Sequence, residues 1–201
     1  MAEQEEHAFM GSQRREAIAR AAVHVLAANG VSGLSMQAVA KQCAMPKSVV
    51  VYHVGDRQGL LTLAAEALLH SRHTLELPVF QVDGDPRQHL SAWLNLQFDA
   101  VEHADSPIRL VWVLQLDRES SFVKLAMPGV DKNLIYRLGQ LLTRGHAQAC
   151  WHAPDGLRAA AAVKAMTDGF LLQALANADR PDDVRKIRAA CRGAVMDLLV
   201  R

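Results

Sequence analysis

The chain has 201 residues, and its 22 lysines and arginines nearly balance its 21 aspartates and glutamates, which leaves a formal charge of +1. A chain of this length can bury a hydrophobic core that is stable without disulfides or a structural metal ion. The small net charge argues at first against a nucleic-acid partner. No stretch approaches about 18 consecutive apolar residues, and the acidic residues Glu3, Glu5 and Glu6 do not suit the start of a signal peptide. The three cysteines form no CxxC pair and are expected to be reduced. We therefore expect a cytoplasmic protein without a membrane segment.

Apolar residues recur at helical spacing and period-two alternation is nearly absent, which predicts an all-α protein of about nine helices. The first helix is expected from near Ser12 to Asn29, with Gly30 as its left-handed cap. Residues 1–11 are predicted to be a disordered tail.

Two short helices, two residues apart, are predicted next. One begins at a Ser35 cap and ends near Cys43, and the other follows Pro46. Small and apolar residues form the inner face of this pair: Val39, Ala40, Cys43, Val50 and Val54. Such spacing has the geometry of a helix-turn-helix, in which the second helix enters the major groove of DNA. Its outer face presents Lys47, Ser48, Val51 and Tyr52.

A fourth helix is expected from an Asp56 cap to Pro78, followed by a turn over residues 79–86. Five further helices are predicted at about 87–104, 107–119, 128–148, 157–178 and 182–200. Segments 49–52 and 110–114 have strand propensity, but their neighbours assign both to helices.

The helix predicted at 157–178 is apolar on two faces. One face carries Ala161, Ala165, Leu172 and Leu175, and the other carries Val163, Met166, Phe170 and Ala174. The core of one monomer covers one such face, and a two-fold related copy is the simplest cover for the other. We therefore expect a homodimer formed through the last two helices.

Over residues 13–61 the sequence resembles the tetracycline-repressor (TetR) family of bacterial transcriptional regulators. The match consists of the amphipathic first helix, the supporting helix with Ala38-Val39-Ala40, the turn at residues 43–47 and the run from Val50 to Leu61. Residues 165–172 further resemble the choline-responsive, BetI-like branch. The resemblance implies an N-terminal three-helix DNA-binding domain and a C-terminal helical bundle that binds a ligand and dimerises.

The resemblance also implies which residues meet DNA. The residues that match Lys47, Ser48, Val51 and Tyr52 face DNA in the family, and the residue that matches Arg57 meets a phosphate. The full set of candidate DNA-binding residues is Ser35, Gln37, Lys47, Ser48, Val51, Tyr52, His53 and Arg57. Pro46 departs from the family pattern and removes a backbone donor, while Val51 replaces a usual aromatic residue and could contact a thymine methyl group.

Charge separates along the chain. Between Ser12 and Leu60 there are six basic and two acidic residues, a formal charge of +4, so the overall +1 conceals a basic N-terminal region. We assign residues 12–56 to the DNA-binding domain and residues 57–201 to the ligand-binding and dimerisation domain.

Most aromatic residues lie between positions 80 and 170, where they could line an apolar ligand pocket or simply fill the core. The candidate ligand-binding residues are Trp93, Phe98, Trp112, Leu116, Asp117, Tyr136, Asp168 and Phe170, with His103 and Gln115 as further polar members. An aspartate among aromatic rings would suit a cationic ligand.

A second possible site is the H-x3-C-x-H cluster of His146, Cys150 and His152, whose donor types suit zinc or copper. The alternative is that these side chains only mark the end of a helix. No metal or other cofactor is predicted.

Three classes of function remain. The first is a homodimeric repressor that releases a palindromic double-stranded operator when it binds a small-molecule effector of unknown identity. The second, an enzyme, is not expected, because no GxSxG, P-loop, GxGxxG or HExxH motif occurs. The third is a helical interaction protein with a degenerate DNA-binding head, an alternative favoured by Pro46 and Val51.

Overall fold

The computed structural model describes residues 2–80, 83–117 and 121–200, and all regular elements in these three ranges are helical. The prediction of an all-α protein is therefore confirmed. The helices are α1 (Ala2–Gly33), α2 (Met36–Gln42), α3 (Lys47–Val54), α4 (Arg57–Glu76), the 3-10 turn η1 (Leu77–Phe80), α5 (Pro86–Glu102), α6 (Pro107–Leu116), α7 (Ser121–Ala147), α8 (Gly156–Ala176) and α9 (Pro181–Val200).

Caps set several of these boundaries as the sequence predicts. The Ser35 hydroxyl accepts a hydrogen bond from the Ala38 amide at 3.2 Å, and an Asp56 carboxylate oxygen accepts one from the Gly59 amide at 2.8 Å. Each bond satisfies an amide that the first turn of a helix leaves without a partner. Both segments with strand propensity are helical, in α3 and α6.

Other boundaries differ from the prediction. Helix α1 begins at Ala2, so the predicted disordered tail over residues 1–11 does not agree with the structure, and a composition rich in helix formers accounts for this helix. Helix α7 begins at Ser121 and continues through Pro128, which the prediction placed at its start. Of the predicted turn, residues 81–82 lie outside the described residues, as do residues 118–119 of the helix predicted at 107–119.

The chain divides into two compact units. The first comprises residues 1–72 and 104–125, and the second comprises residues 73–103 and 126–201. These units group the chain differently from the functional division after residue 56, which stays a prediction. Within the described residues, no helix is long and apolar enough to cross a membrane.

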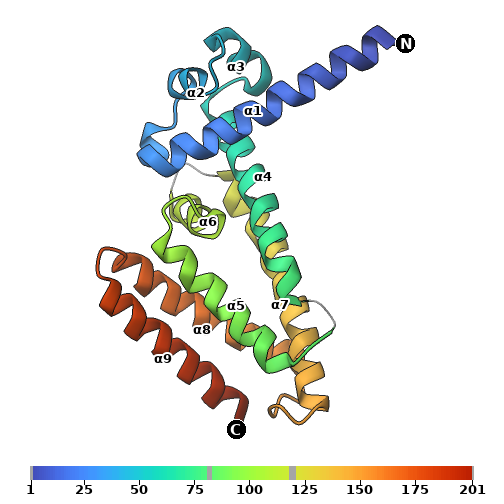
Figure 1. Cartoon of the computed structure of the whole chain (residues 1–201), viewed down its shortest axis with the longest axis vertical. Coiled ribbons are helices and arrows are strands. Elements are labelled where there is room, and N and C mark those ends of the chain that lie inside the picture. Colours follow the sequence, from blue (N-terminus) through green and yellow to red (C-terminus); the bar gives the residue numbers. More distant parts are fainter. Residues whose placement is uncertain (1, 81–82, 118–120, 201) are drawn as a thin grey trace. The chain divides into compact units, whose positions relative to one another are not determined.

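Each unit has its own apolar core. In the first unit α2 packs on α1 and α3 packs on α2 (Figure 1), around fully buried side chains such as Ile18, Leu34 and Val50. In the second unit α8 and α9 lie side by side (Figure 1), and α5 packs on both of them. Cys191 is buried in this second core, and burial raises the pKa of its thiol although a hydrogen bond with Thr167 opposes the shift.

Candidate functional site

The helix-turn-helix forms in the first unit with the inner face that the sequence predicts. Val39 and Ala40 of α2 and Val50 of α3 are buried. The turn between the helices contains Ala44 in the left-handed region, with φ of 52°, a conformation in which a small side chain costs least. The Met45 amide donates to the Ala40 carbonyl at 3.0 Å and closes this turn. Local packing therefore fixes α3 against α2.

The opposite face of α3 is exposed. Lys47, Ser48, Val51 and Tyr52 are all exposed, and 86% of the Tyr52 surface is accessible. The Tyr52 ring meets the His53 ring edge to face, with centroids 5.3 Å apart. A large exposed aromatic residue contributes little to a core, so this face suits a partner with hydrogen-bonding and apolar groups. Ser35 and Gln37 of the α2 segment are also exposed.

A groove runs between the first part of α1 and α3. Its lining residues are Gly11, Ser12, Arg14, Arg15, Ser48, Val49, Tyr52 and His53. Its two arginines, Arg14 and Arg15, are not among the residues predicted to bind DNA, although both contribute to the basic charge of this region. The side chain of Arg15 also pairs with Glu66 of α4 at 3.2 Å. The spacing of α1 alone could not place these arginines beside α3, because that depends on how the two helices pack.

Arg57 is placed differently from the expectation of a phosphate contact. Its guanidinium group donates hydrogen bonds to the backbone carbonyls of Leu34 and of Val31, the latter at 2.9 Å. The side chain is half-buried. This placement uses both terminal nitrogens of the guanidinium group within the chain, so it does not support the predicted phosphate contact.

The residues predicted to bind a ligand divide between the two units. Trp93, Phe98, Tyr136, Asp168 and Phe170 belong to the second unit, and Trp112, Leu116 and Asp117 belong to the first. Trp93 and Phe98 are fully buried, whereas Leu116 and Tyr136 are 61% and 57% exposed. Grouping the eight residues in one pocket therefore stays a prediction.

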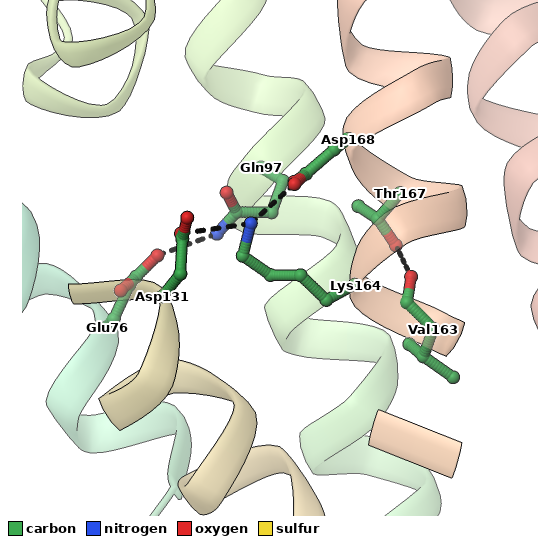
Figure 2. Close-up of polar contacts among 7 residues, drawn as sticks. All are labelled: Glu76, Gln97, Asp131, Val163, Lys164, Thr167 and Asp168. Carbon is green, nitrogen blue, oxygen red and sulfur yellow. Dashed lines mark hydrogen bonds and ion pairs between the residues drawn. The ribbon is translucent and has the colours of Figure 1, made fainter. Parts of the chain in front are cut away.

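Asp168 lies in a polar cluster of the second unit that the sequence did not predict (Figure 2). The Lys164 ammonium group is 3.1 Å from an Asp131 carboxylate oxygen and also pairs with Asp168, one helical turn away. Nearby, the buried Gln97 amide donates to Glu76 at 3.0 Å (Figure 2). The Lys164 side chain is only 8% exposed, so these carboxylates compensate the cost of burying its charge. Lys164 thus supplies an internal cation to Asp168, one of the two aspartates in the predicted ligand set.

Two buried indole groups lack a hydrogen-bond acceptor in the part of the chain that the structure describes. They are the Nε1–H groups of Trp93 in the second unit and Trp112 in the first. A buried donor without an acceptor costs about 1–3 kcal/mol, and a ligand oxygen or a water molecule can relieve that cost. Trp93 precedes Gln97 by one turn of α5, so the two lie on one face of the helix.

The possible metal cluster does not assemble. The rings of His146 and His152 are 5.5 Å apart and edge to face, while Nδ1 of His146 accepts from the Ala153 amide at 3.4 Å. The Cys150 thiol points to the Gln148 carbonyl. Among the described residues there is no group of three histidine, cysteine or acidic side chains that could hold a metal ion, so this geometry gives the metal hypothesis no support.

Helix α8 is buried on one side only. Val163, Thr167 and Ala174 are buried, whereas the other face exposes small and apolar residues, namely Leu157, Ala161, Ala165, Gly169, Leu172 and Ala176. A Cβ atom added at Gly169 would meet nothing within 4 Å. The packing within the monomer therefore does not explain this glycine, which weakens the middle of a helix by about 1 kcal/mol relative to alanine.

No family model matches the chain. It is 26% identical over 185 residues to the HTH-type transcriptional regulator BetI of Paraburkholderia phytofirmans. The matched region covers 88% of this chain and 89% of that protein. Among solved structures, a TetR transcription regulator of Haloarcula marismortui has a TM-score of 0.77 and 19% identity, covering 94% of this chain and 100% of that one. A putative transcriptional regulator of Saccharomonospora viridis in complex with choline has a TM-score of 0.74 and 17% identity, and the match covers 94% of this chain and 99% of that one. At this identity the structural matches establish the fold.

Proposed function

We propose that this chain, which has the fold of the TetR-family transcriptional regulators, binds operator DNA as a homodimer in the cytoplasm and regulates transcription. The observation that carries the proposal is the outer face of α3, where Lys47, Ser48, Val51 and Tyr52 are exposed above a packed helix-turn-helix core. An α-helix of this kind fits the major groove of DNA. The 26% identity to a helix-turn-helix regulator supports the same function.

The proposed contacts follow from the placement of the side chains. Lys47, in the first turn of α3, would meet a phosphate or a guanine edge, and the polar groups of Ser48, Tyr52 and His53 would hydrogen-bond to bases or the sugar-phosphate backbone. Val51 would contact a thymine methyl group. Ser35 and Gln37 would meet the backbone from α2, and Arg14 would extend the basic surface along the groove beside α3.

The proposed homodimer explains the exposed apolar face of α8. A second copy packed on Leu172 and its neighbours would bury this face, and Gly169 would allow the two helices to approach closely. Dimerisation would also place two recognition helices on two half-sites of a palindromic operator. No enzymatic activity is proposed, since the relatives named above are described as regulators.

We further propose that a small molecule bound in the second unit releases the operator, so that the protein acts as a repressor. The choline complex of the Saccharomonospora viridis regulator supports a small-molecule ligand for this fold. The Trp93 indole N–H would donate to a ligand oxygen. Such a ligand can act only through different affinities for the operator-bound and released conformations.

A mobility shift tests DNA binding, with DNA upstream of the chain's own and adjacent genes and with random-sequence duplexes. Lys47→Ala is expected to weaken binding and to lower the slope of log affinity against log salt concentration by about 1, because one phosphate contact releases about one counterion. Lys186→Ala, a change at an exposed lysine of α9, is the control and should leave the slope unchanged. If the wild-type protein binds no duplex, the alternative of a degenerate DNA-binding head is favoured instead.

Choline, other quaternary amines and polyamines test the effector. A compound that binds the folded protein at 100 times its Kd is expected to raise the free energy of unfolding by about 2.7 kcal/mol and to weaken operator binding. Choline carries a hydroxyl oxygen that can accept from the indole, so Trp93→Phe, which removes the N–H donor and keeps an aromatic ring, should reduce both effects of choline. If no compound changes either stability or DNA affinity, this effector class is wrong while the DNA-binding proposal stands.

A further inference from the structure

The two ends of the helix-turn-helix segment meet at a single side chain. Arg57 is the first residue of α4, and its two bonded carbonyls, on Leu34 and Val31, lie 23 and 26 residues earlier in the chain. The residues between these ends include all of α2 and α3. The Arg57 side chain therefore closes a loop that contains the whole recognition segment.

The bonded carbonyls lie where the α1 backbone changes direction. Gly30 interrupts the helical conformation with φ of 67° and ψ of −175°, and the Leu34 amide bonds back to the Val31 carbonyl at 3.1 Å. Carbonyls at the end of a helix lack partners within the helix, and a cation there also complements the helix dipole. Arg57 therefore caps the end of α1 from the start of α4.

The start of α4 is also in close contact with the end of α3. A Cβ atom at Gly59 would lie 1.9 Å from the backbone oxygen of Val54, the last residue of α3. Only a glycine permits this approach. The ends of α1 and α3 are thus both held against the first turn of α4, one by the Arg57 side chain and the other by backbone packing.

We propose that Arg57 is a positioning residue, which sets the orientation of α3 for the operator, and that it is not a phosphate ligand. The planar guanidinium group presents two nitrogens at once to two carbonyls, whereas a lysine ammonium group offers a single nitrogen. Hydrogen bonds from a charged group are stronger than neutral ones. The inference rests on the proposed DNA-binding function and assigns this basic residue to the alignment of the recognition helix.

The experiment compares the wild-type protein with Arg57→Met, Arg57→Lys and Lys47→Ala. Each full-length protein is titrated with a duplex that the wild type selects from a random pool and with a scrambled duplex of the same length, over a series of salt concentrations. Arg57→Met is expected to bind the selected duplex about tenfold or more weakly, to bind the scrambled duplex almost as the wild type does, and to keep the wild-type salt slope. Lys47→Ala should lower the slope by about 1.

Arg57→Lys decides the question if the methionine variant does not fold. It keeps the charge but loses the second nitrogen, so it is expected to bind the selected duplex at least about threefold more weakly, at an unchanged slope. A lysine variant that binds like the wild type, or a methionine variant whose slope falls by about 1, would make Arg57 a phosphate ligand and overturn the proposal.

Amide hydrogen exchange measures the same constraint without DNA. Amides of α2 and α3 should exchange faster in both Arg57 variants than in the wild type and should be unchanged in Lys47→Ala. Unchanged exchange in the Arg57 variants would overturn the positioning role. A wild-type protein that binds no duplex would instead refute the proposed function, and the exchange experiment would still test what Arg57 does.

Discussion

Leu172→Glu is expected to give a folded monomer that binds the operator more than about 100-fold more weakly than the wild type. Leu172 is 40% exposed on the small and apolar face of α8, where a second copy would cover it. A symmetric interface would then bury two glutamates without cationic partners, which costs more than the lost apolar contact. Because linking two DNA-binding heads raises affinity about 10²–10⁴-fold, separating them removes that gain.

Analytical ultracentrifugation measures the first part of this prediction, and a mobility shift with the selected duplex measures the second. Leu75→Glu is the matched control, since it places the same charge on a similarly exposed leucine of α4 that belongs to none of the proposed sites. The control should remain dimeric and bind DNA like the wild type. If Leu172→Glu stays dimeric, the interface lies elsewhere on the chain.

Lys164→Met is expected to lower the free energy of unfolding by about 2–3 kcal/mol. The change keeps most of the side-chain volume but leaves Asp131 and Asp168 without the ammonium group that they share (Figure 2). Removing one partner of a buried ion pair costs about 3–5 kcal/mol. We expect less because the two carboxylate side chains are 31% and 29% exposed, so water screens part of their repulsion.

Chemical denaturation of the purified protein checks this value. Lys186→Met is the control, because Lys186 pairs with Asp183 at 3.5 Å but is 79% exposed, and it should change stability by less than about 0.5 kcal/mol. Adding Asp131→Asn to Lys164→Met should recover part of the loss, since one of the two facing charges is gone. A Lys164→Met protein as stable as the wild type would show that the ion pairs contribute nothing to the fold.

Local chemistry made the helix-turn-helix predictable. Ser35 caps α2, Asp56 caps α4, and the spacing of Val39, Ala40 and Val50 defines the inner face. Each of these features depends on residues within about one helical turn, so a single sequence contains the signal. The division of α8 into a buried and an exposed face follows from the same periodicity.

Contacts between distant segments were not predictable in this way. Lys164 and Asp168 are one turn apart and could be recognised as a pair, but Asp131 joins them from another helix. The possible metal cluster shows the same limit, because spacing does not determine the direction in which the side chains of His146 and His152 point.

Arg57 shows most clearly the difference between features that depend on neighbouring residues and contacts that depend on the packing of distant segments. A basic residue at the first position of α4, an all-α fold and an exposed face on α3 could all be predicted from the chain, because helical periodicity and caps act over a few residues. The hydrogen bonds from the Arg57 guanidinium group to the carbonyls of Val31 and Leu34 could not be predicted, because they depend on how the helices pack. Those carbonyls come within reach through the kink at Gly30 and the packing of α2 and α3, which bring residues more than 20 positions apart into hydrogen-bonding distance.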